Sequence, residues 1–263
     1  MEINKKETMP DLSSKAAQVR QNQNSPLPNR EGVWGWVLQK FILKLEILFD
    51  ILKSFLDWVY YQRCYFCGKT SRKSIMCDLC FNLVKTKLKP VRQYKVLGKI
   101  EIFSAFVYKE EILKLIRGIK FHNRKELAPY AAGLLYEYWQ NTHYADRNFV
   151  IIPMPSHEKR LKKRKYNHIE LIAEEFSKLT GYAVNTELVH KIKDTKPQYQ
   201  LSRAERQENL HGAFSVNEES YGGENLLLLD DICTTGVTMQ EIIKALNKKG
   251  ITKLCGLVLS NPE

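Results

Sequence analysis

The stretch NLLLLDDICTTGVT, residues 225–238, constrains this chain more than any other. Its four consecutive leucines, residues 226–229, have the length and composition of a strand buried on both faces. Two acidic residues, Asp230 and Asp231, follow this run, and a Gly/Thr turn then leads to an amphipathic stretch at 239–249 that is typical of a helix. A buried strand that ends in acids and a small-residue turn before a helix favours an α/β fold.

The Gly/Thr turn has the chemistry of a phosphate site. Backbone N–H groups at a helix N-terminus and the helix dipole attract anions, and a glycine lets the backbone approach them closely. Threonine hydroxyls can add hydrogen bonds to phosphate oxygens, while carboxylates, which only accept, suit the two hydroxyls of a ribose ring. We therefore expect the ribose on Asp230 and Asp231, and the phosphate on Thr234, Thr235, Gly236 and Thr238.

Four apolar residues, two acids and then x-x-T-T-G-x-T resemble the signature with which type I phosphoribosyltransferases bind phosphoribosyl pyrophosphate (PRPP). The match has no gap. The plain alternative is a buried strand that ends in a solvated acidic turn. An ATPase would instead need a G-x-x-x-x-G-K-[ST] loop. The G-K-T at residues 68–70 has Arg63 in place of the first glycine, so that class is excluded.

Length and charge limit the class of protein further. A chain of 263 residues has room for one α/β domain of ordinary size and smaller appendages. Its formal net charge of +12 indicates a polyanionic partner, either a phosphorylated substrate or nucleic acid, with a merely basic surface as the alternative. The polar N-terminus lacks the apolar core of a signal peptide, so we expect a cytoplasmic protein.

The N-terminal part divides into two segments. Residues 1–33 are rich in Asn, Gln, Ser, Lys and Pro and are expected to be a disordered tail. Apolar residues then recur at helical spacing over 34–62, which predicts an amphipathic helix, and no uncharged run approaches the ~20 residues of a membrane span. This helix either packs on the protein's own body or, with Trp34, Trp36 and Trp58 at its ends, makes peripheral membrane or partner contact through 34–61.

Two C-x-x-C pairs lie in the next segment, residues 63–90. Four thiolates are enough to close a tetrahedral zinc site with no open position, which predicts a structural zinc. A redox-active pair is the alternative, but two pairs this close in a chain without an export signal favour metal. Cys233 and Cys255 fall in expected core strands and are interpreted as buried thiols. The four expected zinc ligands are Cys64, Cys67, Cys77 and Cys80.

Residues 91–263 alternate between expected strands and helices, which predicts a mostly parallel, doubly wound sheet flanked by helices. The signature strand should be central, and ligands should bind beyond the carboxyl ends of the strands. The basic run at 159–165 follows an expected strand and is placed to meet a pyrophosphate, with a solvated basic helix start as the alternative. The polar segment 196–212 is expected to be a mobile lid. Strands are expected at 100–108 and 148–155, and helices at 110–119, 127–139 and 166–179.

From about residue 56 to residue 260 the chain resembles the ComF family of competence proteins, which carry an N-terminal zinc-binding knuckle and a phosphoribosyltransferase-type domain. Lys165 stands where the family has glycine and His168 where it has glutamine, and residues 1–55 have no assigned counterpart. Within residues 164–168 the matching positions are Arg164, Tyr166 and Asn167. The other matching motifs are Lys120-Phe121, Pro153-Met154-Pro155, and the residues Gln198, Leu201, Arg206, Asn209, Gly212, Ala213 and Phe214.

The resemblance implies binding of PRPP together with Mg²⁺ and a role in DNA uptake during natural transformation. Single-stranded DNA and a helicase-like ATPase are the implied partners. If a transfer reaction occurs, Asp230 and Asp231 would stabilise the charged ribose, and Arg164 and Arg206 the leaving pyrophosphate. The intact acidic pair and phosphate loop favour an alternative function, an active phosphoribosyltransferase of nucleobase salvage, although no sequence element selects an acceptor base.

Overall fold

The computed structural model describes residues 40–52, 62–71, 74–87, 94–97, 100–195 and 203–262. The chain divides into two compact units, Met1–Tyr60 and Tyr61–Glu263. Our expectations for the tail at 1–33, for the flanks of the helix at 34–39 and 53–61, and for residues 196–202 of the lid lie outside the described residues.

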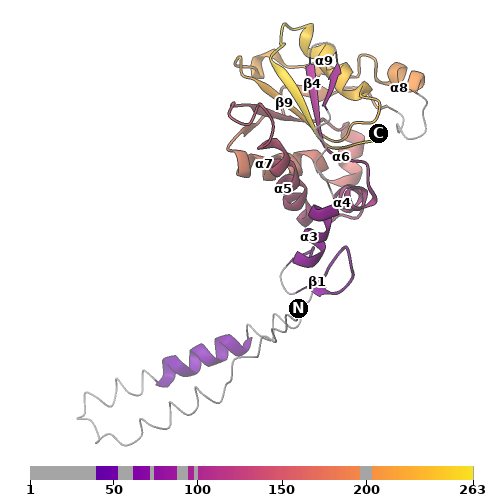
Figure 1. Ribbon diagram of the computed structural model, residues 1–263. Coiled ribbons are helices and arrows are strands. Elements are labelled where there is room, and N and C mark those ends of the chain that lie inside the picture. Colours follow the sequence, from indigo (N-terminus) through magenta and orange to yellow (C-terminus); the bar gives the residue numbers. More distant parts are fainter. Residues whose placement is uncertain are drawn as a thin grey trace, which may run out of the picture. The chain divides into compact units, whose positions relative to one another are not determined.

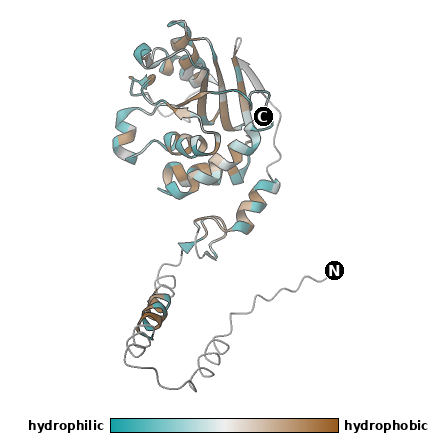
Figure 2. Ribbon diagram, turned by 90° about the vertical axis from the view of Figure 1, so that its left-hand side faces the viewer, coloured by the Kyte–Doolittle hydropathy of each residue, from teal (hydrophilic) through white to brown (hydrophobic). Residues whose placement is uncertain are grey.

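In the first unit, residues 40–52 form a helix whose residues are all exposed. Phe41, Leu45, Leu48 and Leu52 recur at helical spacing, and the helix is predominantly brown in Figure 2, the colour of apolar residues. Among the residues that the structure describes, no helix is long and apolar enough to span a membrane.

The second unit is built on a six-stranded sheet, and every neighbouring pair of strands is parallel except the β3–β4 pair at one edge. The prediction of a mostly parallel sheet is confirmed, and the signature strand, β9, lies inside the sheet between β10 and β5 (Figure 1). The strands, in their order across the sheet, are β3 (Tyr94–Leu97), β4 (Ile100–Val107), β10 (Leu254–Asn261), β9 (Leu226–Ile232), β5 (Val150–Pro153) and β6 (Ala183–Val184).

Helices cover both faces of this sheet, which is why β9 is apolar on both sides. The four leucines at 226–229 are each at most 1% exposed. The chain runs from β4 through α4 (Glu110–Phe121) and α5 (Ala128–Trp139) to β5, and through α6 (Glu158–Arg164) and α7 (His168–Thr180) to β6. These connections move across the sheet toward β6. The connection from β9 to β10, through α9 (Val237–Asn247), moves the other way, toward β3. Because such crossovers are right-handed, α5 and α7 share one face and α9 lies on the other.

Three local differences from the sequence-based expectations concern the site. The strand β9 continues through both acids to Ile232, so the acids belong to the strand end. The basic run at 159–165 forms most of α6, as in the alternative interpretation of a solvated basic helix start. Part of the expected lid is also helical, because α8 spans Arg203–Leu210. Both short helices consist of residues with good helix propensity but lack an apolar stripe, so periodicity did not reveal them.

The remaining elements are short. A small antiparallel sheet pairs β7 (Val189–Lys191) with β8 (Phe214–Val216), and two 3₁₀ turns, η1 (Lys125–Leu127) and η3 (Glu218–Ser220), connect larger elements. The cysteine-containing segment consists of the pair β1 (Gln62–Arg63) and β2 (Thr70–Ser71) followed by α3 (Asp78–Lys87).

Candidate functional site

The two acids at the carboxyl end of β9 have different surroundings. Asp231 is 5% exposed, and its Oδ2 lies 2.8 Å from Lys120 Nζ and 3.0 Å from His168 Nε2. Asp230 is half-buried, and its Oδ1 accepts a hydrogen bond of 2.8 Å from the backbone N–H of Asp231. Successive side chains on a strand point to opposite faces, so the pair is divided between an ion-paired carboxylate and one that is more accessible.

These surroundings separate the titration of the two acids. Burial would raise the pKa of Asp231, but Lys120 and His168 outweigh it and hold that pKa well below its ordinary value. Burial, and then the charge of Asp231, raises the pKa of Asp230 well above its ordinary value. Burial lowers the pKa of His168 despite the opposing effect of Asp231. A neutral His168 therefore donates its Nε2–H to Asp231, and its Nδ1 is a buried atom without a hydrogen-bond partner in the structure.

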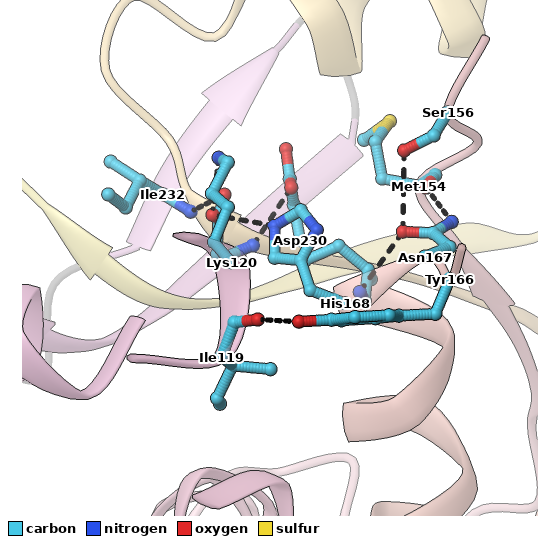
Figure 3. A network of polar contacts seen from close by, with 11 residues as sticks. Ile119, Lys120, Met154, Ser156, Tyr166, Asn167, His168, Asp230 and Ile232 are labelled. Atoms are coloured by element: carbon cyan, nitrogen blue, oxygen red, sulfur yellow. Dashed lines mark hydrogen bonds and ion pairs between the residues drawn. The ribbon is translucent and has the colours of Figure 1, made fainter. Parts of the chain in front are cut away.

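The segment after α6 is fastened to the end of α4, and this contact positions the lysine and the histidine. The hydroxyl of Tyr166 donates to the backbone carbonyl of Ile119, in the last turn of α4 (Figure 3). Asn167 caps the N-terminus of α7 with its side-chain oxygen and donates to the carbonyl of Met154 at 3.0 Å. The end of α4, the start of α7 and the residue that follows β5 thus come together near the carboxyl end of β9.

The expected phosphate loop connects β9 to α9. Gly236 is the N-terminal boundary residue of α9 and has φ 74°, a conformation that favours glycine. Thr234 is exposed, and Thr235 and Thr238 are half-buried. The N-terminus of α9 follows directly on the carboxyl end of β9 and has no side-chain cap, and a helix N-terminus of this kind attracts anions.

The two arginines expected to contact pyrophosphate lie on different helices. Arg164 ends α6, and its guanidinium carbon is 5.1 Å from the centroid of the Phe121 ring. Arg206 lies in α8, but the orientation of its side chain is outside what the structure describes. Lys165, which replaces the glycine of the resembled family, has φ 67° and ends α6 in the left-handed conformation. The left-handed backbone conformation, which a glycine adopts freely, costs a lysine about 1 kcal/mol.

The four cysteines of the two C-x-x-C pairs come together. Their Sγ atoms all lie within 4.8 Å of one another, and those of Cys67 and Cys77 are 3.9 Å apart. Four Zn–S bonds of ~2.3 Å would place sulfur atoms roughly 3.8 Å apart, so the cluster fits a tetrahedral ion. Burial raises the pKa of Cys64, but backbone N–H groups outweigh it and bring that pKa to about 6, which favours the thiolate.

The cysteine cluster lies on a segment that packs against α4 and α5. Lys114 Nζ donates to the carbonyl of Phe66 at 3.0 Å, and the Tyr130 hydroxyl donates to the carbonyl of Met76 at 3.1 Å. Tyr130 also meets Phe81 edge to face. Folding of the metal segment is therefore linked to the same helix, α4, that ends at the candidate site.

The roles of two residues do not follow from the sequence. In the sequence, Lys120 is only part of a matching Lys-aromatic pair, and His168 is only a departure from a family motif. Both contact Asp231, from positions 111 and 63 residues away along the chain. Contacts over such separations leave no local pattern, although the lysine at the end of an expected helix was a partial signal.

Comparison with known proteins agrees with this geometry. Residues 170–260 match the family model "Phosphoribosyl transferase domain". Competence protein F of Haemophilus influenzae is 32% identical over 152 residues, which cover 56% of this chain and 66% of that protein. The DNA utilization protein YhgH of Salmonella typhi is 28% identical over 155 residues, covering 57% and 66%. Competence protein ComFC of Bacillus subtilis is 24% identical over 193 residues, covering 71% and 72%.

The sheet is mostly parallel, and its inner strand β9 ends in an acidic pair and a glycine-threonine loop. With the domain match, these features define a phosphoribosyltransferase-like α/β protein. The named relatives narrow the likeness further, since the chain is similar to competence protein F, ComFC and the DNA utilization protein YhgH. The matched region spans just under two thirds of the first two relatives.

Proposed function

We propose that this chain binds PRPP with Mg²⁺ and acts in DNA uptake. The observation that carries the proposal is the uninterrupted signature on β9 and α9, which brings an acidic pair and a glycine-threonine loop to the carboxyl end of a central strand. The relatives are named as competence and DNA utilization proteins, which favours DNA uptake over nucleobase salvage.

The 5′-phosphate of PRPP would lie on the loop and the N-terminus of α9, where Thr234, Thr235 and Thr238 supply hydroxyls. Asp230 is the better acceptor for a ribose hydroxyl, because Oδ2 of Asp231 is shared by a lysine and a histidine. Magnesium prefers substrate oxygens and water to an all-protein cage, so it would bind with PRPP without a dedicated ligand set.

Three further parts of the proposal concern cofactors, partners and location. The four cysteines would hold zinc in a closed, structural site. The family resemblance and the net charge of +12 support single-stranded DNA and a helicase-like ATPase as partners in the cytoplasm. The exposed apolar helix at 40–52 would supply a peripheral contact with a membrane or with such a partner.

One experiment separates DNA handling from salvage. Pyrophosphate release from PRPP is measured with each of the common free nucleobases, and single-stranded DNA binding is measured over a range of salt concentrations. Our proposal predicts a steep, linear fall of log affinity with log salt, since each phosphate contact on a single strand contributes a slope of about −0.7. Rapid pyrophosphate release with one nucleobase, and no DNA binding at low salt, would instead identify a salvage enzyme.

Neutralising the basic residues of α6 tests where DNA binds. Lys159 pairs with Asp194 at 2.8 Å and Lys162 with Glu158 at 3.6 Å, but both pairs are exposed, and such contacts are weak enough for phosphates to displace. Changing four residues to glutamine should weaken binding of an oligothymidine and reduce the magnitude of its salt slope by up to about 3. The four residues are Lys159, Arg160, Lys162 and Lys163.

A matched control removes the same charge at the opposite edge of the sheet. Lys244, Lys248, Lys249 and Lys253 lie at the end of α9 and before β10, where the chain enters the amino end of that strand, whereas α6 follows the carboxyl end of β5. Their replacement by glutamine should leave most of the salt slope in place. Unchanged DNA binding of the α6 variant, together with a collapse of its PRPP affinity, would mean that α6 serves PRPP instead.

A further inference from the structure

An exposed aromatic ring stands at the edge of the candidate site. Phe121 is the last residue of α4 and is 62% exposed, directly after the lysine that pairs with Asp231. Single exposed apolar residues are common on protein surfaces, so exposure alone assigns no role to Phe121. The cations that lie near its ring indicate a role.

Cations lie close to the ring of Phe121 and to the ring of Tyr166. The guanidinium carbon of Arg164 lies 5.1 Å from the centroid of the Phe121 ring, and Lys120 Nζ lies 5.9 Å from it. Lys125 Nζ lies 4.5 Å from the centroid of the Tyr166 ring. Tyr166 is in turn bonded to the last turn of α4. We call Phe121, Arg164, Tyr166 and Lys125 the α4-end cluster.

The cluster lies at the end of α6, a helix whose sequence EKRLKKR is rich in basic residues. Arg164 is both the last residue of α6 and the cation over Phe121, so the exposed ring lies at the end of this basic segment. Alternating aromatic rings and cations in a basic track are the arrangement by which proteins hold single-stranded nucleic acids, with bases stacked on rings and phosphates near cations. An apolar protein partner would need a larger apolar patch than one exposed ring with two cations beside it.

We propose that the α4-end cluster binds a nucleobase of single-stranded DNA, with Phe121 as the stacking platform and with Arg164 and Lys125 near the flanking phosphates. This inference rests on the proposed role in DNA uptake and gives it a location: the bound strand passes along α6 to the edge of the PRPP site. The same ring chemistry would also suit a free nucleobase that approaches PRPP, and the experiment includes an arm for each source.

Replacing Phe121 tests the platform. Affinity for a fluorescent oligothymidine is measured by anisotropy for the full chain and for two variants, Phe121→Ala and Phe121→Trp. Loss of one stacked base should weaken binding roughly 5- to 100-fold in the alanine variant, and tryptophan should restore it. Stacking involves no counterion, so the alanine variant should keep its salt slope, whereas Arg164→Gln should lose about 0.7 of it.

The control variant is Leu179→Ala, which truncates an exposed apolar residue near the end of α7 and should bind the oligonucleotide like the unmodified chain. Thermal melting of each variant shows whether it is folded. Equal oligonucleotide affinity of folded Phe121→Ala and the unmodified chain would overturn the proposal, as would an unmodified chain that does not bind the oligonucleotide at all.

The second arm titrates adenine, guanine, cytosine, thymine and uracil separately in the presence of PRPP and Mg²⁺. Binding of the oligonucleotide but of no free base supports DNA as the source. Free-base binding that depends on Phe121, with unchanged oligonucleotide binding, would overturn the DNA assignment. If the unmodified chain gives no heat with PRPP, the PRPP part of the proposed function fails, while dependence of DNA binding on Phe121 would still support the stacking site.

Discussion

Replacing Cys77 with serine is expected to abolish stoichiometric zinc binding and to lower the melting temperature of the chain. Cys77 lies in the four-thiol cluster, and structural zinc contributes free energy on the order of 10 kcal/mol in isolated zinc fingers. The segment is too small to replace this contribution with an apolar core. Elemental analysis and scanning calorimetry of the purified chain measure the two effects.

The matched control is Cys255→Ala. Cys255 is a buried thiol in β10, outside the cluster, and its truncation should leave the zinc content unchanged. The Cys77 variant should still bind PRPP, because the expected PRPP residues lie on other elements. Unmodified protein without stoichiometric zinc, purified in the absence of chelators, would contradict the assignment of the cluster.

Replacing Lys120 with methionine is expected to lower the free energy of unfolding by about 3 kcal/mol at neutral pH. The change keeps an unbranched side chain of similar length but leaves Asp231 buried with only a neutral histidine beside it. Loss of one partner of a buried ion pair is strongly destabilising, because the remaining charge has lost its compensation. Chemical denaturation of both proteins measures the difference.

Lys178→Met is the control for this variant. Lys178 forms a contact of similar length, 2.7 Å, with Glu175, but on the exposed surface of α7, where ion pairs contribute about 0–1 kcal/mol. A loss as small for Lys120→Met as for Lys178→Met would show that the Lys120–Asp231 contact does not stabilise the fold.

The effect of Lys120→Met should depend on pH in a defined direction. The pKa of Asp231 lies well below its ordinary value, so its stabilising contribution is present at neutral pH and is lost as the pH falls through the folded-state pKa. In the variant, burial without the lysine raises this pKa, and Asp231 takes up a proton at a higher pH. The stability difference between the two proteins should therefore begin to shrink as the pH falls through the raised pKa of the variant, above the ordinary value of about 4, and should continue to shrink as the pH falls toward the lowered pKa of Asp231 in the unmodified chain.

Much of the fold could be predicted from the sequence because its main signals are local. The leucine run at 226–229 predicted the buried central strand, and Gly181, with φ 76°, ends α7 close to where the pattern placed its end. The short polar helix α8 was not predicted, and α6 was predicted only as an alternative, because neither has an apolar stripe of its own.

The acidic pair of the candidate site is evident in the sequence, but the different contacts of its two members are not. The sequence placed Asp230 and Asp231 together and assigned both to ribose. The structure engages Asp231 with Lys120 and His168, which leaves Asp230 as the more accessible acid. This division depends on packing among three segments that lie far apart in the chain, and neither propensity nor spacing encodes it.

A calorimetric titration of the unmodified chain with PRPP and Mg²⁺ tests the central claim most directly. We expect saturable heat, and we expect Asp230→Asn with Asp231→Asn to weaken binding by at least about 1.5–3 kcal/mol, since charged hydrogen bonds contribute on this order. Asp230→Asn alone should show most of this loss, because that acid is the more accessible one. Absence of heat from the folded, unmodified chain at millimolar PRPP with Mg²⁺ would contradict the account, whatever the other variants show.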